Sequence, residues 1–316
     1  MDDLIFFAGD RPVGVIVPST VFSYQDGQVL INGPAGISRA AQGDELGLHR
    51  ALVDTGALVA GQPHEVNQVL DLLANPDTSR TVSYLLCSAR QCDDVISDIA
   101  TLRRSRVMVV GCGGIGSSIC MLLAGAGVRQ FLLIDADVIE RSNLNRQVFW
   151  TLADVGQKKV DVLKRALEAR FDGVDVICLD RSAQLDELRE MAIENVQGVA
   201  ITADNPPSLA RNGWKIAKAC GVPVVAGGYL HHLSASFHFL PEDCQQIEAA
   251  ARLAESEQWS ALPSAIMPSY GPMNFSLASI LSANLIASLA RRTFGQQKTT
   301  VARWDSRGFN CSGEGD

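Results

Sequence analysis

The chain has 316 residues, of which 47% are hydrophobic and 20% charged, so it can bury a large core and is long enough for two domains. Its formal net charge of −8 argues against binding bare nucleic acid or an anionic membrane, and 6% aromatic residues disfavour a base-stacking surface. Most of this charge lies in residues 1–78, which hold three arginines, no lysine and ten acidic residues, a net charge of −7.

No targeting segment is expected, because Met1 is followed by Asp2 and Asp3 and not by a basic and then an apolar run. The longest uncharged stretch, 258–290, contains three prolines and two asparagines, which favours a loop and a buried helix over a membrane span. The eight cysteines are scattered and form no CxxC pair, which is typical of reduced thiols. We therefore expect a cytoplasmic protein that does not contact membranes.

Residues 1–78 are predicted to form short strands followed by two helices. The expected segments are strands at 4–7 and 13–17, a hairpin over 22–31, and helices at 45–55 and 63–75. Asp26-Gly27 is a turn signal inside the hairpin, and 75–78 resembles a linker. A few strands and two or three helices suit a small winged-helix-like α+β domain over 1–78.

From residue 106 onward, apolar strands alternate with helices, which is the pattern of a parallel α/β sheet. The expected strands are 107–110, 131–134, 174–179, 199–202 and 222–226. The expected helices are 115–126, 158–171, 185–193 and 209–220. The sequence therefore predicts a Rossmann-like α/β domain over 79–316.

A glycine-rich turn follows the first of these strands, at Gly111, Gly113, Gly114 and Gly116. Glycines at this point let the backbone approach a phosphate at the N-terminus of the next helix. Asp135 ends the following strand, at the separation expected of a carboxylate that accepts the ribose hydroxyl groups. The pattern predicts a nucleotide site, and its alternative is a tight turn without a ligand.

Polar and basic residues beyond Asp135 favour ATP over a nicotinamide cofactor. They are Asn143, Arg146, Lys158 and Lys159. A triphosphate needs such groups, because its charge must be neutralised as the bond to pyrophosphate breaks. Asp204 follows the strand 199–202 at the carboxyl edge of the sheet, a position that suits a Mg²⁺ ligand for ATP.

Together, the segments GCGGIG, LIDADVIERSNLNRQ, DVGQKK and ADN resemble the ThiF/MoeB superfamily of ubiquitin-activating-type adenylating enzymes over about residues 79–310. The resemblance implies that ATP is bound by the four glycines with Asp135 and Asp137. It also implies phosphate contacts from Asn143, Arg146 and Lys159, and a Mg²⁺ ion on Asp204. Two alternatives remain open: Asn143 caps a turn, or Lys158 is the functional lysine.

In this family an arginine that precedes the glycine-rich strand reaches the ATP of the partner subunit. Arg80 stands at that place, so the resemblance implies a catalytic role for it in a homodimer; the alternative is an ordinary surface arginine. The apolar segment 273–292 is expected to form a helix that contributes to the two-fold interface.

Two features depart from many members of the superfamily. Their zinc-binding CxxC pairs are missing, with single residues Cys244 and Cys311 in those regions, so zinc is not expected. Cys244 is the one candidate for a thioester-forming cysteine. Without such a cysteine, the intermediate is expected to be resolved in place.

The N-terminal module resembles that of the peptide-modifying subgroup, which includes the microcin-maturing enzyme MccB and the pantocin-maturing enzyme PaaA. This implies a clamp for the leader of a ribosomally made precursor peptide, and the acidic residues favour a basic leader. The predicted function is adenylation of a carboxyl or amide group, with glutamate activation and dehydrative cyclisation as the outcome. The alternatives are nucleotidyl transfer to the peptide, activation of a ubiquitin-like sulfur carrier, or a binding scaffold without activity.

Overall fold

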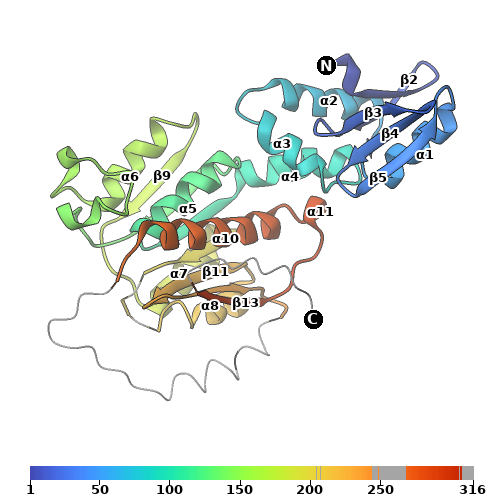
Figure 1. Ribbon diagram of the computed structural model, residues 1–316. Helices are drawn as coiled ribbons and strands as arrows, with labels where there is room; N and C mark the ends of the chain where they lie inside the picture. Colours follow the sequence, from blue (N-terminus) through green and yellow to red (C-terminus); the bar gives the residue numbers. More distant parts are fainter. Residues whose placement is uncertain (204, 207, 244–247, 249–267, 306, 308–316) are drawn as a thin grey trace. The chain divides into compact units, whose positions relative to one another are not determined.

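The computed structural model describes residues 1–203, 205–206, 208–243, 248, 268–305 and 307 (Figure 1). The chain forms two compact units. Unit 1 comprises Met1–Arg103 and Ala290–Gln296, and unit 2 comprises Arg104–Leu289 and Gln297–Asp316. The predicted domain boundary after residue 78 stays a prediction.

Unit 1 contains two antiparallel sheets of three strands each. The first has the order β1-β2-β6, with β1 (Ile5–Ala8), β2 (Arg11–Ile16) and β6 (Leu58–Ala60), and follows the short helix η1 (Asp2–Leu4). The second has the order β3-β4-β5, with β3 (Val21–Gln25), β4 (Gln28–Gly33) and β5 (Gly36–Ala41). The predicted hairpin is confirmed: Asp26 and Gly27 both have positive φ and join β3 to β4. The strand β5 was not predicted.

The helices of unit 1 are α1 (Glu45–Asp54), α2 (Pro63–Ala74), α3 (Ser79–Leu86), α4 (Cys92–Arg104) and the short α11 (Arg291–Phe294). The side chain of Asp44 caps α1 by accepting a hydrogen bond from the Gly47 amide at 2.9 Å. Apolar faces of α2, α3 and α4 share a buried core with β2 and β6. The α+β character is as predicted, but α3, α4 and α11 lie beyond the predicted module 1–78.

The short helix α11 brings the C-terminal part of the chain into unit 1. The Thr293 amide donates a hydrogen bond at 2.7 Å to the carboxylate of Asp98, which is only 3% exposed. The Arg292 guanidinium bonds to Asp93 and donates to the hydroxyl of Ser97 at 2.7 Å. These contacts satisfy a buried carboxylate of α4, so residues 290–296 are an integral part of unit 1.

Unit 2 is built on a seven-stranded sheet with the order β13-β12-β11-β10-β7-β8-β9. The five parallel strands are β7 (Arg106–Val110), β8 (Gln130–Ile134), β9 (Asp175–Leu179), β10 (Gly198–Ile201) and β11 (Val224–Leu230). Two antiparallel strands, β12 (Leu233–Phe239) and β13 (Thr300–Asp305), extend the sheet beyond β11. The parallel strands are confirmed as predicted, whereas the antiparallel extension was not predicted.

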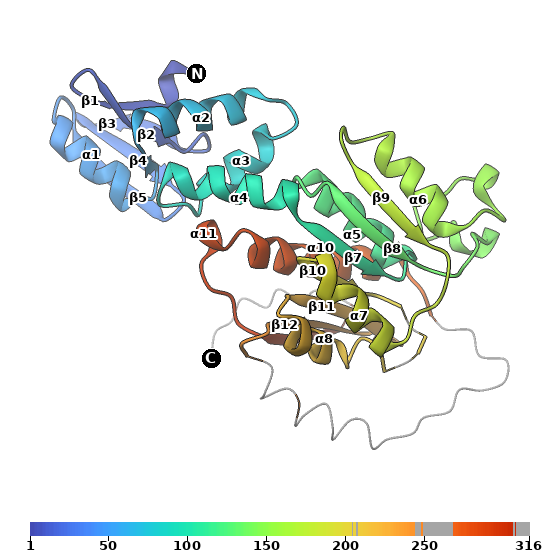
Figure 2. The same cartoon turned by 180° about the vertical axis from the view of Figure 1, so that it is seen from behind.

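Helices cover both faces of this sheet. They are α5 (Gly114–Gly125), α6 (Lys159–Glu168), α7 (Leu185–Asn195), α8 (Gly213–Cys220) and α10 (Gly271–Leu289), with the short η2 (Arg141–Asn143) and η3 (Leu152–Asp154). The helices α5 and α10 lie side by side on one face, and α7 and α8 cover the other (Figures 1 and 2). This arrangement confirms the predicted Rossmann-like α/β class.

Among the described helices, α10 alone is long and apolar enough to cross a membrane by length and composition. Half of this segment is buried within the protein, where α10 packs against α5 and the strands β11 and β12. In the structure α10 is therefore a core helix of unit 2, as the prolines and asparagines of the sequence indicated.

Candidate nucleotide site

The glycine-rich turn joins β7 to α5 at the carboxyl edge of the parallel sheet. Gly111 has φ of +89°, and a side chain on it would collide with the backbone at Ala203. A side chain on Gly116 would collide with the carbonyl oxygen of Gly111, so this glycine lets α5 approach the strand closely. The first amides of α5 have no acceptors within the helix, and they lie at the positive end of its dipole. The turn therefore offers donors to an anion.

Asp135 lies directly after β8 and contacts the same turn. Its Oδ2 accepts a hydrogen bond from the Cys112 amide at 2.6 Å, and its Oδ1 accepts one from the Asp137 amide at 2.7 Å. Burial raises the pKa of Asp135 above its ordinary value, and these two hydrogen bonds act in the opposite direction. Each carboxylate oxygen keeps a further lone pair, with which it can accept a ribose hydroxyl group.

The structure separates the two candidate lysines. Lys159 begins α6 and is 6% exposed, and its Nζ donates a hydrogen bond at 2.7 Å to Oδ2 of Asp137. The side chain of Lys158 is half exposed and pairs with Asp180 instead. The backbone amide of Asp137 donates a hydrogen bond to Asp135. Of the two lysines, therefore, only Lys159 is linked, through Asp137, to the carboxylate at the glycine-rich turn. Of the two alternatives, the geometry favours Lys159.

Asn143 and Arg146 lie in and just after η2. The side chain of Asn143 is 7% exposed, and its Oδ1 accepts a hydrogen bond from the Glu140 amide at 3.1 Å. Asn143 therefore does cap a turn, and its contact with phosphate stays a prediction. Arg146 donates from Nη1 to the carbonyl oxygen of Ser142 at 2.6 Å and to Oδ1 of Asn145 at 3.0 Å.

A polar cluster that sequence reasoning missed lies against the same turn. Oδ1 of Asn274, in the first turn of α10, accepts a hydrogen bond at 2.8 Å from the hydroxyl group of Tyr229 in β11. The hydroxyl groups of Tyr229 and Ser269 are 2.5 Å apart. A side chain on Gly114, the first residue of α5, would collide with Asn274. No motif marks this cluster, because Asn274 and Tyr229 are 45 residues apart and meet only through tertiary packing.

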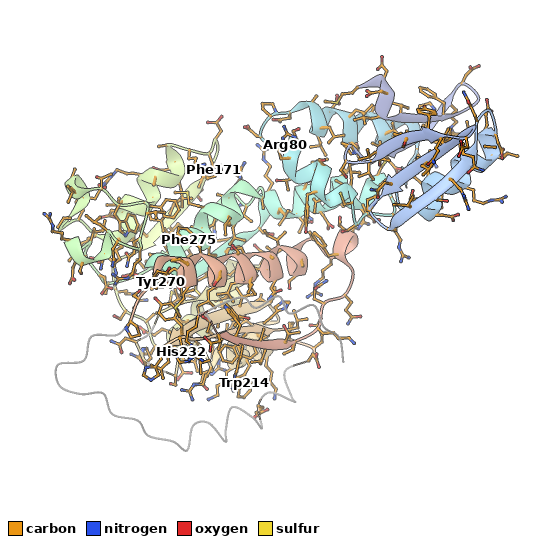
Figure 3. All side chains as sticks on the ribbon, in the orientation of Figure 1. Arg80, Phe171, Trp214, His232, Tyr270 and Phe275 are labelled. Carbon is orange, nitrogen blue, oxygen red and sulfur yellow. The ribbon has the colours of Figure 1, made fainter. Side chains whose placement is uncertain are left out.

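The remaining predicted residues are Arg80, Asp204, Cys244 and Cys311. Arg80 is exposed on α3 of unit 1 and has no hydrogen-bond or ion-pair partner among the described residues (Figure 3). Asp204, Cys244 and Cys311 lie outside the described residues, so their predicted roles are untested. Within the described part of the chain, no three His, Cys, Asp or Glu side chains gather into a group that could hold a metal ion.

The sequence profile of the ThiF family matches residues 90–312. This chain belongs to the ThiF family. The predicted family membership is thereby confirmed, and the glycine-rich turn, Asp135 and Lys159 all fall within the matched region.

Curated ThiF-type relatives match parts of the chain. Adenylyltransferase and sulfurtransferase MOCS3 of Drosophila grimshawi is 31% identical over 184 residues, which are 57% of this chain and 39% of that protein. The chain thus spans less than half the length of the curated relatives that it matches.

Two solved structures resemble the ThiF-family chain over nearly its full length. E. coli MccB, solved with MccA, superposes with a TM-score of 0.69 at 19% identity, covering 95% of this chain and 98% of that chain. PaaA superposes with a TM-score of 0.57 at 18% identity, covering 90% and 94%. At these identities the likeness is one of fold, and it includes unit 1 as well as the α/β unit.

Proposed function

We propose that this protein is an ATP-dependent adenylating enzyme. The observation that carries the proposal is the connected group at the carboxyl edge of the sheet. The carboxylate of Asp135 accepts hydrogen bonds from the backbone amides of Cys112, in the glycine-rich turn, and of Asp137. The carboxylate of Asp137 accepts a hydrogen bond from the buried ammonium group of Lys159. An acceptor for the ribose and a desolvated cation for the phosphates thus lie beside the N-terminus of α5. The names of curated relatives, which include adenylyltransferases, support the same activity.

In the proposed reaction, a carboxyl or amide oxygen of the substrate attacks the α-phosphorus of ATP, and the bond to pyrophosphate breaks. The product carries AMP in place of a poor leaving group, so that a nearby nucleophile can then displace AMP. Lys159 and Arg146 are proposed to neutralise phosphate charge as pyrophosphate leaves. Asp204 is proposed to hold Mg²⁺, which supplies further positive charge when bound.

We propose a ribosomally made precursor peptide as the substrate, held by unit 1. The support is that the fold likeness to MccB, named as a microcin C7 biosynthetic enzyme and solved with MccA, extends over unit 1. The strand β3 is exposed at all five residues, and among the described strands it pairs with β4 alone, so its other edge can accept a peptide as an added strand. The ten acidic residues in 1–78 favour a basic leader.

A surface hollow lies beside the start of β3 within unit 1. It has a volume of about 410 Å³ and is lined by Ser19, Val21, Asn32, Gly33, Pro34, Tyr84, Cys87 and Ser88. Val21 and Tyr84 are exposed apolar side chains there, with exposed fractions of 61% and 67%. We propose that a peptide added to β3 reaches this hollow, and that the hollow anchors an apolar side chain of the leader.

The proposed outcome is activation of glutamate side chains and dehydrative ring closure. The experiment incubates the enzyme with ATP, Mg²⁺ and the short peptide encoded beside its gene, and measures pyrophosphate release and peptide mass. Loss of water from the peptide supports cyclisation, whereas a gain of AMP identifies nucleotidyl transfer. A carrier protein that ends in Gly-Gly is the parallel substrate. Pyrophosphate release with that carrier and none with the peptide would contradict the peptide assignment.

The proposal includes a homodimer in which Arg80 acts on the ATP of the partner subunit. Subunits carrying Arg80→Ala and Asp204→Ala would then regain activity when mixed, because one site of the heterodimer keeps both residues. Light scattering measures the assembly, and pyrophosphate release measures the rescue. If the protein is a monomer, or if activity is not rescued after verified subunit exchange, Arg80 does not act on the ATP of a partner subunit.

A further inference from the structure

The proposed reaction makes no use of Asn274, a buried polar side chain beside the glycine-rich turn. Asn274 lies in the first turn of α10 and is only 2% exposed. Its Oδ1 accepts a hydrogen bond from the hydroxyl group of Tyr229 at 2.8 Å. An asparagine this deeply buried needs partners for its amide nitrogen as well as for its oxygen.

The side-chain nitrogen of Asn274 points at the N-terminus of α5. It lies where a side chain on Gly114 would begin, so that any Cβ at this position would collide with it. The nitrogen carries two N–H donors, and among the described residues neither meets an acceptor. These donors are therefore open to an acceptor that is not a protein group, such as the oxygen of a bound ligand.

The surroundings of this nitrogen favour an anionic oxygen as that acceptor. Gly113 precedes α5, and the first free amides of the helix follow it, at the positive end of a 12-residue helix. A helix N-terminus binds phosphate through such amides, and an additional side-chain donor beside Gly114 increases the number of hydrogen bonds. The unpartnered nitrogen, which lies against Gly114, is therefore beside the end of α5 that carries the free amides.

The hydroxyl group of Tyr229 determines which end of the Asn274 amide faces that position. Ser269 lies 2.5 Å from the Tyr229 oxygen and can donate to it, which leaves the hydroxyl proton of Tyr229 for Oδ1 of Asn274. With Oδ1 held in this way, the nitrogen faces α5. The opposite orientation would present a carbonyl oxygen to the anion and repel it.

We infer that Asn274 binds a phosphate oxygen of the nucleotide at the N-terminus of α5, and that Tyr229 is a positioning residue for it. This inference rests on the proposed ATP-dependent function, since it assigns a further residue to the same nucleotide site. It places one binding residue on α10 and its support on β11, outside every segment that carries the family motifs.

The inference is tested by measuring equilibrium binding of ATP, AMP and adenosine by calorimetry. Asn274→Asp keeps the shape of the side chain but sets a carboxylate against the phosphate, so ATP and AMP should bind about 10- to 100-fold more weakly. Adenosine, which has no phosphate, should bind as in the wild type. Tyr229→Phe keeps the ring and removes the hydroxyl group, and should lower the affinity for ATP by roughly 3- to 10-fold.

Ser276→Ala is the matched control, because this serine lies on the same helix and bonds only to the carbonyl oxygen of Met273 among the described residues. It should leave the affinity for ATP unchanged. If Asn274→Asp does not fold, as judged by thermal unfolding, Tyr229→Phe decides. Wild-type ATP affinity in a folded Asn274→Asp or in the deciding Tyr229→Phe would overturn the inference. An equal loss for adenosine would also overturn it, because it would indicate a structural role.

Binding alone separates this inference from the proposed function. If Asn274→Asp loses ATP affinity while the wild type releases no pyrophosphate with any acceptor, the phosphate contact stands and the adenylation proposal fails. If ATP affinity is unchanged while the wild type adenylates its peptide, the function stands and the assignment of Asn274 fails.

Discussion

The two units differ in how far their strands are exposed to solvent and in where the candidate ligand sites lie along the strands. In unit 2 the central strands are almost wholly buried, as β10 is at all four residues, and the candidate nucleotide site lies at the ends of the strands. In unit 1 the strand β3 is exposed along its whole length, and the surface hollow lies beside a strand edge. Ligand sites at strand ends depend on a few residues at defined spacing, whereas an edge binds through its backbone and shape.

Charge is also distributed unevenly along the chain. Residues 1–78 have a net charge of −7, and the remaining residues have a net charge of −1 that includes every lysine of the chain. Because every lysine lies in unit 2, an anionic nucleotide is expected there, and the acidic segment 1–78 of unit 1 is expected to attract a cationic peptide. If this comparison holds, single substitutions will affect one ligand and leave the other unchanged.

The largest effect is expected from Lys159→Ala. This substitution removes the buried ammonium and leaves Asp137 without its partner, so peptide-dependent pyrophosphate release should fall by about 100- to 1,000-fold. Lys158→Ala is the matched control, because its half-exposed side chain pairs with Asp180, and it should keep activity within about threefold. The reverse order of the two effects would assign the functional role to Lys158.

A smaller effect is expected from Tyr84→Ala in the hollow of unit 1. Loss of this exposed ring should lower the affinity for the precursor peptide by about tenfold and leave the affinity for ATP unchanged. Ile37→Ala, which removes an exposed apolar side chain from the opposite edge strand β5, serves as the control. Fluorescence anisotropy of a labelled peptide measures both variants. Equal weakening by the two would show that the hollow has no special role.

The smallest effect concerns the pH dependence of ATP binding. Burial raises the pKa of Asp135, so on acidification this carboxylate is protonated at a higher pH than an exposed aspartate and stops accepting from the ribose. The wild type should therefore lose ATP affinity relative to Asp135→Asn as the pH falls from about 7 to about 4. Near pH 7 the variant should bind ATP about three- to fivefold more weakly. A constant ratio across this range would contradict the role of Asp135.

The pH dependence of folding stability due to Asp135 is opposite in direction to the pH dependence of ATP binding. Because the folded pKa of Asp135 is raised, the folded state favours the protonated carboxyl, and its contribution to stability is largest below the unfolded pKa. This contribution is lost as the pH rises through the folded pKa. Thermal unfolding without ATP should therefore show that Asp135→Asn gains stability relative to the wild type as the pH rises through the same range.

The sequence predicted the parts of the site that lie close to one another along strand ends. Gly111, Asp135 and the lysine pair belong to consecutive elements of a parallel sheet, so spacing alone indicates that they converge. Spacing cannot separate Lys158 from Lys159, because neighbouring residues at the start of a helix point in different directions and only packing decides which one is buried. The role of Asn274 could not be predicted for a related reason, because its contact with Tyr229 depends on how α10 packs on the sheet.

The short helix α11 has a consequence for how this protein can be rearranged. Asp98 receives its amide hydrogen bond from Thr293, which is 195 residues further along the chain. A fragment that ends at Arg103 would expose the core of unit 1 where residues 290–296 pack, and would leave a buried carboxylate without its donor. Recombination that transfers only the first hundred residues to another catalytic domain would thus carry an incomplete module. A functional chimaera must also supply the segment 290–296.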